Sequence, residues 1–197
     1  MLFYARNCRG GCGERRTFRV ILRWMATNHP SIIKKNLDNI VFFGRWDDLY
    51  TLVATPCEKE MWNLVRAQWL EDVANFQQKK PISIMAKWLK SVNTSSEESC
   101  ALGRKTAREL GLSEKEYRKA LSKFRNYLNV CERRMSKKEW KKIVYSEVPS
   151  YAMKRYRKAF AKNDEERFTS YKMSLEKKME DGTISSKDIK STVMYPM

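Results

Sequence analysis

The stretch Pro81–Ser96, PISIMAKWLKSVNTSS, lies between two long segments of helical pattern and has a poor helical pattern itself. Its first half is apolar, two lysines then surround Trp88, and a run of Ser, Asn and Thr follows. Such short polar side chains hydrogen-bond to nearby backbone and therefore favour turns and helix caps. We interpret residues 81–96 as a central loop around which the helices are organised.

Two roles are open for this central loop. Lys87, Trp88, Asn93 and Thr94 are residue types that hold a nucleic-acid backbone and stack one base. The alternative is that Trp88 fills the hydrophobic core and the serines cap the next helix. Composition alone favours the packing role, because aromatic residues and caps most often serve packing.

The rest of the chain has the apolar spacing of helices, and no convincing strand alternation appears. Residues 14–27, for example, carry Phe18, Leu22 and Met25 at helical spacing. The pattern predicts an all-α protein, a HEAT-like helical-repeat array of short amphipathic helices. We expect one domain over residues 1–183, which divides into two packed helical halves, 1–80 and 95–183, if it divides at all. Residues 184–197 are expected to form an extended C-terminal tail.

Two segments match the capping box that starts a helix. In each, a serine can accept a hydrogen bond from the backbone three residues later, where a glutamate reaches back. They are Ser113–Glu116 and Ser136–Glu139. Both are predicted to begin a helix.

The charge of the chain is strongly positive. There are 40 Lys and Arg against 23 Asp and Glu, a net charge of +17, and the pI is near 9.8. Residues 113–167 hold 17 Lys and Arg against eight acids, a local excess of +9. This balance favours a polyanionic partner, with nucleic acid first. The predicted phosphate contacts in these basic helices are Arg118, Arg125, Lys154, Arg155 and Lys158.

A glycine-rich turn, RGGCGERR at residues 9–16, opens the helix at 14–27. Its backbone N–H groups could hold a phosphate with help from Arg9, Arg15 and Arg16. A tight turn between helices, where glycine permits positive φ, explains the same residues. Both interpretations stay open at this point.

The sequence gives little support to catalysis or metal binding. Asp47 and Asp48 are the best pair of acids, but we favour a cap and an ion pair with Arg45 for them. The one histidine, His29, lies at a helix end before a proline, and no catalytic motif is present. We therefore predict no enzyme activity, no metal and no cofactor.

Five long motifs resemble a known family. They are FYARNCRGGCGER, FFGRWDDL, AKWLKSVNTSS, LGLSEKEYRKALSKFRNYLNVCERRMS and VPSYAMKRYRKAFAKNDEERF, at residues 3–15, 42–49, 86–96, 110–136 and 148–168. In this order they resemble the DUF2828 family of phages, bacteria and plants. That family is similar to the TROVE module of Ro ribonucleoproteins, telomerase-associated proteins and vault proteins.

The resemblance implies a HEAT-like helical domain that binds RNA on a basic surface. It also implies further helices before residue 1 and a von Willebrand A domain after residue 197, whose metal-binding Asp-x-Ser-x-Ser is absent here. We expect a non-enzymatic RNA-binding module for structured or single-stranded RNA. The alternative is a helical protein–protein scaffold, of phage or host-interaction type, with an acidic protein as partner.

The expected location is the cytoplasm, or the host cytoplasm if a phage encodes the chain. Five scattered cysteines read as reduced thiols, and the first residues lack a secretion signal. No apolar run approaches the ~20 residues of a membrane span, so no membrane partner is expected.

Overall fold

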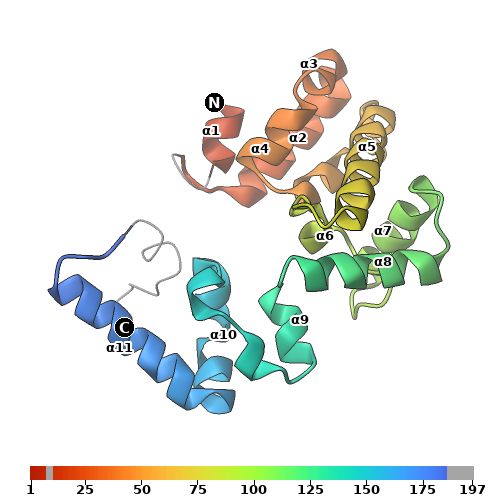
Figure 1. Cartoon of the computed structure of the whole chain (residues 1–197). Helices are drawn as coiled ribbons and strands as arrows, with labels where there is room; N and C mark the ends of the chain where they lie inside the picture. Colours follow the sequence, from red (N-terminus) through yellow and green to blue (C-terminus); the bar gives the residue numbers. More distant parts are fainter. Residues whose placement is uncertain (8–10, 186–197) are drawn as a thin grey trace. The chain divides into compact units, whose positions relative to one another are not determined.

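Helices joined by short loops make up the protein in the computed structural model, which describes residues 1–7 and 11–185 (Figure 1). No strand occurs in these ranges, so the predicted all-α class is confirmed. The α-helices vary from 4 to 20 residues in length. A HEAT-like repeat stays a prediction. No described helix has the length and hydrophobicity needed to span a membrane.

The chain divides into two compact units, Met1–Leu128 (unit 1) and Asn129–Met197 (unit 2). The boundary between these units follows residue 128, whereas the sequence predicts a division, if there is one, between residues 80 and 95. The tail predicted at 184–197 lies outside the described residues from 186 onward.

Unit 1 contains α1 to α8 and the 3₁₀-helix η1. Their bounds are α1 Leu2–Arg6, α2 Arg15–Asn28, α3 Pro30–Lys34, α4 Leu37–Phe43, η1 Trp46–Leu52, α5 Glu58–Gln77, α6 Met85–Trp88, α7 Glu97–Glu109 and α8 Glu114–Tyr127. Unit 2 contains α9 Cys131–Ser136, η2 Trp140–Lys142, η3 Tyr145–Glu147, α10 Ser150–Asn163 and α11 Glu165–Glu180.

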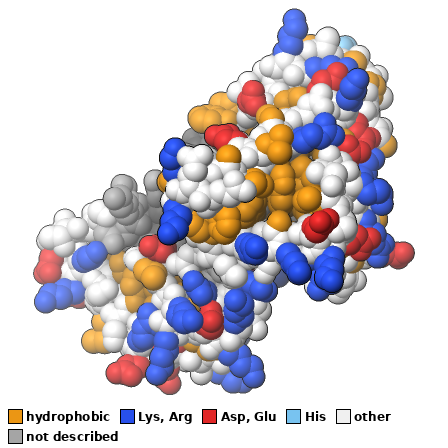
Figure 2. Space-filling view, turned by 45° about the vertical axis from the view of Figure 1, so that its right-hand side comes forward, with side chains coloured by type: hydrophobic (Ala, Val, Ile, Leu, Met, Phe, Trp, Pro, Cys, Tyr) orange, Lys and Arg blue, Asp and Glu red, His pale blue; other side chains and the backbone are white. Residues whose placement is uncertain are grey.

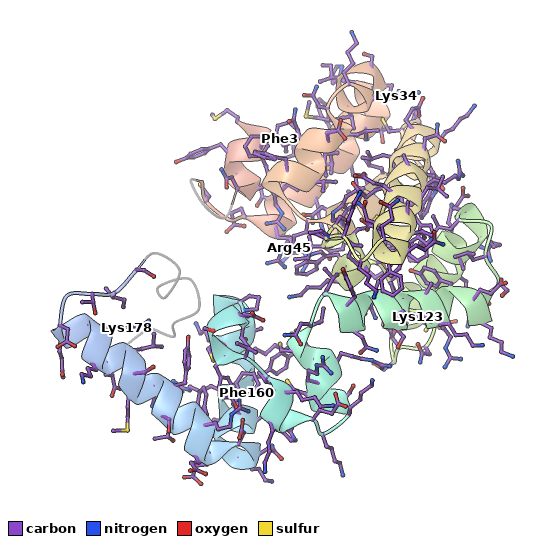
Figure 3. All side chains as sticks on the ribbon, in the orientation of Figure 1. Phe3, Lys34, Arg45, Lys123, Phe160 and Lys178 are labelled. Carbon is purple, nitrogen blue, oxygen red and sulfur yellow. The ribbon has the colours of Figure 1, made fainter. Side chains whose placement is uncertain are left out.

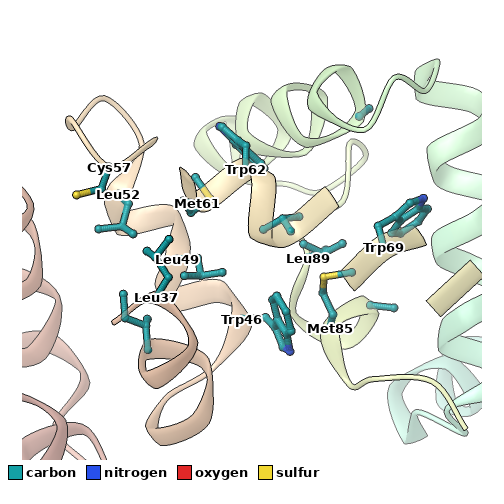
Figure 4. Close-up of a cluster of buried hydrophobic side chains, with 14 of the residues drawn as sticks. Leu37, Trp46, Leu49, Leu52, Cys57, Met61, Trp62, Trp69, Met85 and Leu89 are labelled. Carbon is teal, nitrogen blue, oxygen red and sulfur yellow. The ribbon is translucent and has the colours of Figure 1, made fainter. Parts of the chain in front are cut away.

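The core of unit 1 explains why residues 81–96 are not a boundary. Trp69 of α5 lies 5.1 Å from Phe124 and 6.1 Å from Tyr117 of α8, measured between ring centroids. Met85 and Leu89 of the central loop are buried in the same cluster, beside Trp69 (Figure 4). Helices on both sides of the loop thus share one core, and the loop lies inside it.

One predicted capping box is confirmed and the other is not. Ser113 accepts from the Glu116 backbone N–H, and the Glu116 carboxylate accepts from the Ser113 N–H, so α8 begins as predicted. Ser136 instead ends α9, and its hydroxyl donates to the Arg133 carbonyl. Glu139 pairs with Arg134 at 2.9 Å rather than capping a helix. A salt bridge has replaced the cap.

Two faces of helix α2 contact other parts of unit 1. Phe18, Leu22 and Ala26, four residues apart, are buried in the core. The neighbouring row of Arg15, Arg19 and Arg23, also four apart, donates to side chains and carbonyls of η1 and the residue after it. The arginine row of α2 therefore binds protein and holds η1 in place.

Glu58 in the first turn of α5 supplies an expected pH effect. Burial opposes its charge, but hydrogen bonds from Lys105, the Trp62 indole and the Ala54 backbone outweigh it and lower the pKa of the carboxyl. Its stabilisation is thus present above the unfolded pKa of about 4.3 and is lost as pH falls through the lower folded pKa. Glu58→Gln should cost about 1 kcal/mol at neutral pH.

The measurement is urea denaturation of wild type and Glu58→Gln across the pH range. The stability difference should shrink as the pH falls below the unfolded pKa. A difference that stays constant down to strong acid contradicts the assignment.

Candidate nucleic-acid interface

The second half of the central loop is fixed by tyrosines from other elements. The Lys90 N–H donates to the Tyr50 hydroxyl at 3.1 Å, and the Tyr117 hydroxyl donates to the Lys90 carbonyl at 2.7 Å. Burial raises the pKa of both tyrosines, so both remain neutral donors and acceptors. The loop backbone also lies against Gly103 of α7, where a Cβ would lie 2.6 Å from the Ser91 carbonyl oxygen.

Arg125 of α8 is the third anchor of the loop. Its guanidinium donates to the carbonyls of Ala86 and Leu89 at 2.9 and 2.8 Å, and to the Ser91 hydroxyl at 2.9 Å. All three nitrogens of the side chain are therefore used inside unit 1. We reassign Arg125 from the predicted phosphate contact to positioning the loop, because each of its three nitrogens already donates within unit 1.

Replacing Arg125 with Gln should destabilise unit 1 by roughly 2–3 kcal/mol, because charge-assisted bonds to buried carbonyls are lost. Amide hydrogen exchange of residues 85–92 should accelerate more than that of the α5 core. The matched control is Arg118→Gln, an exposed cation on the same helix, which should change stability by less than ~0.5 kcal/mol. Equal effects of the two variants would contradict the anchoring role.

Trp88 combines the two roles that the sequence left open. The indole is half-buried and packs against the core of unit 1. The Arg45 guanidinium lies over the ring, 4.5 Å from its centroid, and the Lys87 ammonium lies 5.5 Å from it. The predicted pairing of Arg45 with an acid is wrong, because its side chain contacts Trp88 instead (Figure 3 labels Arg45).

Asn93 and Thr94 are exposed at the tip of the same loop. Thr94 donates from its backbone N–H to the Cys100 sulfur at 3.3 Å and from its hydroxyl to the Ser96 carbonyl at 3.2 Å. Hydrogen bonds from the Thr94 backbone and hydroxyl lower the pKa of the Cys100 thiol. The loop tip is therefore tied to the start of α7, and Ser96 caps that helix as predicted.

The arginines of the glycine-rich turn divide between three places. Arg9 lies outside the described residues. Arg15 pairs with Asp47 at 2.6 Å, so the structure uses it to hold η1. Arg16 is exposed on α2. Of the predicted phosphate contacts in this turn, Arg15 and Arg16 are both exposed, but Arg15 is already paired with Asp47.

Asp47 and Asp48 bind arginines, as their predicted structural role requires, but from different elements. Asp48 is fully buried and pairs with Arg6 of α1 at 2.8 Å and Arg19 of α2 at 2.7 Å. Asp47 pairs with Arg15 and Arg19. Asp48, not Asp47, accepts from the Arg45 backbone N–H at the start of η1.

Most predicted cations of the basic helices are exposed. On α8 the exposed cations include Arg118 and its neighbours Lys115, Lys119 and Lys123. On α10 the exposed cations are Lys154, Arg155, Lys158 and Lys162, and the sequence of this helix contains no acid. Figure 2 shows Lys and Arg side chains spread widely over the visible face. Each unit thus presents a basic helix to solvent.

Two features were missed by sequence reasoning. The sequence pattern predicts an ion pair for Arg45 and does not single out Lys162 as a phosphate contact. Lys162 could have been found, because it continues the four-residue spacing of Lys154 and Lys158. No spacing rule predicts the contact of Arg45 with Trp88, which lies 43 residues further along the chain.

The comparisons with known proteins give a family and name no function. Residues 85–187 match the model of a family described as a domain of unknown function, DUF2828. The chain is 27% identical over 182 residues to uncharacterized protein L728 of Acanthamoeba polyphaga mimivirus, and the alignment covers 81% of this chain. It spans about a third of that relative's length (32%). No solved structure matches.

Proposed function

This chain belongs to the DUF2828 family, and we propose that it is a non-enzymatic RNA-binding helical module. The observation that carries the proposal is α10, a helix of 14 residues with five Lys or Arg and no acid. Lys154, Lys158 and Lys162 follow one another at four-residue spacing, where like charges repel by a few tenths of a kcal/mol per pair. A polyanion removes that repulsion, and nucleic acid is the commonest biological polyanion of this kind.

The exposed cations of α8 support the same partner in unit 1. Lys115, Arg118, Lys119 and Lys123 are all solvent-exposed. Phosphates bound there and on α10 would give affinity without base identity, since phosphate contacts position a strand but do not read its sequence. Bases would meet the central loop near Trp88, where Asn93 and Thr94 supply hydrogen bonding.

We also propose that the protein is related to the TROVE module. In that interpretation the two units are parts of a HEAT-like array that binds structured or single-stranded RNA on its basic helices. The protein would act in the cytoplasm, which is the host cytoplasm if a virus encodes it. The alignment to a mimivirus protein is compatible with a viral setting.

The test is whether RNA co-purifies with the full chain. Without nuclease, the absorbance ratio at 260 and 280 nm should be that of a protein–nucleic acid complex, and RNase but not DNase should abolish it. Ultraviolet crosslinking and sequencing then identify the RNA. A protein that elutes free of nucleic acid at low salt, and binds no added RNA, contradicts the proposal.

A protein–protein scaffold is the second candidate. The exposed face of α2 carries Val20 and Trp24, which are 66% and 58% exposed and lie one helical turn apart. Exposed large apolar side chains of this kind are typical of protein interfaces. The basic helices would then meet an acidic protein. Co-purification of a protein in place of RNA favours this candidate.

A further inference from the structure

Two cations and one indole lie together in unit 1, and no salt bridge among the described residues joins either cation to a carboxylate. Arg45 is the residue directly before η1, and Lys87 and Trp88 belong to α6. The Arg45 and Lys87 head groups lie 4.5 and 5.5 Å from the indole centroid. All three side chains are half-buried, so each keeps a solvent-facing part.

The contrast with the other arginines of unit 1 is informative. Arg6 and Arg19 bind Asp48, and Arg125 binds loop carbonyls. The guanidinium of Arg45, the ammonium of Lys87 and the indole N–H of Trp88 make no hydrogen bond or ion pair with any residue in 1–7 and 11–185. Their donors are therefore left to solvent in this structure.

The site is also fixed before a ligand arrives. Arg125 holds the carbonyls of Ala86 and Leu89, on either side of Lys87 and Trp88. The Arg45 N–H is held by Asp48 at 3.0 Å. Both elements that form the site are therefore anchored in the core, which reduces the ordering cost of binding.

We propose that Arg45, Lys87 and Trp88 bind one unpaired nucleotide, so that the ligand of unit 1 is single-stranded RNA. This inference rests on the proposed RNA-binding function. The indole supports the Arg45 guanidinium, and a base stacks on the opposite side of that plane, as bases do on arginine in single-stranded RNA recognition. Lys87 meets a neighbouring phosphate. Bases of a duplex are already stacked and paired, so they cannot enter.

The decisive variant is Arg45→Lys, which keeps the positive charge but removes the planar group. Its affinity for a short oligouridylate should fall by about 5- to 150-fold, the contribution of one stacked base. Its affinity for a blunt-ended RNA duplex of equal length should stay unchanged. Trp88→Leu should reproduce this pattern because the support of the guanidinium is lost. Trp24→Leu, at an exposed tryptophan on α2, is the matched control.

Each outcome decides between the ideas. Selective loss of oligouridylate binding in Arg45→Lys, with an unchanged melting temperature, supports the site. Unchanged oligouridylate binding, or an equal loss on both ligands, overturns the site but leaves RNA binding standing. Failure of wild type to bind either RNA overturns the proposed function and this site together. If Trp88→Leu melts much lower, Arg45→Lys alone decides.

Discussion

Replacing Asp48 with Ala is expected to lower the free energy of unfolding of unit 1 by about 3–5 kcal/mol. The Asp48 side chain is completely buried and accepts from Arg6, Arg19 and the Arg45 backbone N–H. The Arg6 side chain is 1% exposed. Removal of the carboxylate leaves a guanidinium charge inside the protein without its counter-ion, which is the most costly way to break a buried pair.

Tryptophan fluorescence during urea denaturation measures the free energy of unfolding of unit 1. Five of the six tryptophans lie in residues 1–128, so the signal reports mainly on unit 1. Asp38→Ala is the control, because Asp38 is an exposed acid in the first turn of α4. Its loss should cost less than ~1 kcal/mol, the usual value of a charge near a helix end.

A second substitution separates charge burial from simple loss of packing. Arg6→Met fills a similar volume without a charge, and replacing both partners of a buried pair often costs little. The double variant Arg6→Met, Asp48→Ala should therefore lose less stability than the two single variants lose in sum. The difference, which is the coupling energy, should be at least about 1 kcal/mol. Strict additivity of the two changes would show that the pair is not the source of the loss.

Local rules predicted the elements of this fold well. The apolar spacing of α2 and the capping box of α8 depend on residues within one or two helical turns, and both agree with the structure. The capping box at Ser136 failed because Glu139 had a better partner in Arg134. A local pattern decides a helix start only when no stronger interaction competes for the same side chain.

The division into units depends on contacts that no local rule contains. The sequence suggested a boundary at residues 81–96 because helical periodicity breaks there. The break is real, but Met85 and Leu89 are buried with α5 and α8, so the loop joins the helices on both sides. A change of pattern along the chain thus marks an irregular segment, and burial decides whether that segment separates two cores.

At the candidate site, too, the sequence pattern does not reveal which basic residues make long-range contacts. Arg118 and Arg125 lie on one helix seven residues apart and looked equivalent in the sequence. Arg118 is exposed, whereas Arg125 binds carbonyls 36 and 39 residues away along the chain. Charge counts predict that a basic surface exists, but which cations form it depends on the buried acceptors that claim the others.

The basic face of α10 leads to the second large effect. We expect the triple variant Arg155→Gln, Lys158→Gln and Lys162→Gln to weaken RNA binding at low salt and to flatten its salt dependence. Each phosphate contact on a single strand contributes about 0.7 to the slope of log affinity against log salt, so three contacts contribute about 2. The loss should be similar for RNAs of different sequence, because phosphates carry no base identity.

The stability of the free protein should not fall together with its RNA affinity. Glutamine is a good helix former, and the substitution removes like-charge neighbours from one face of α10. The melting temperature of the free protein should therefore stay constant or rise slightly while RNA binding falls. A variant that binds poorly because it is unfolded shows both quantities falling together.

A matched change on α11 separates contacts on α10 from net charge alone. The triple variant Lys172→Gln, Lys177→Gln and Lys178→Gln also removes three positive charges, from exposed positions of the same unit. On α11, however, four Glu accompany four Lys or Arg. Salt titrations of the three proteins should give a slope for the α11 variant near that of wild type and a lower slope for the α10 variant. Equal slopes for both variants would mean that the RNA responds only to overall charge, and the basic face of α10 would then be available for an acidic protein.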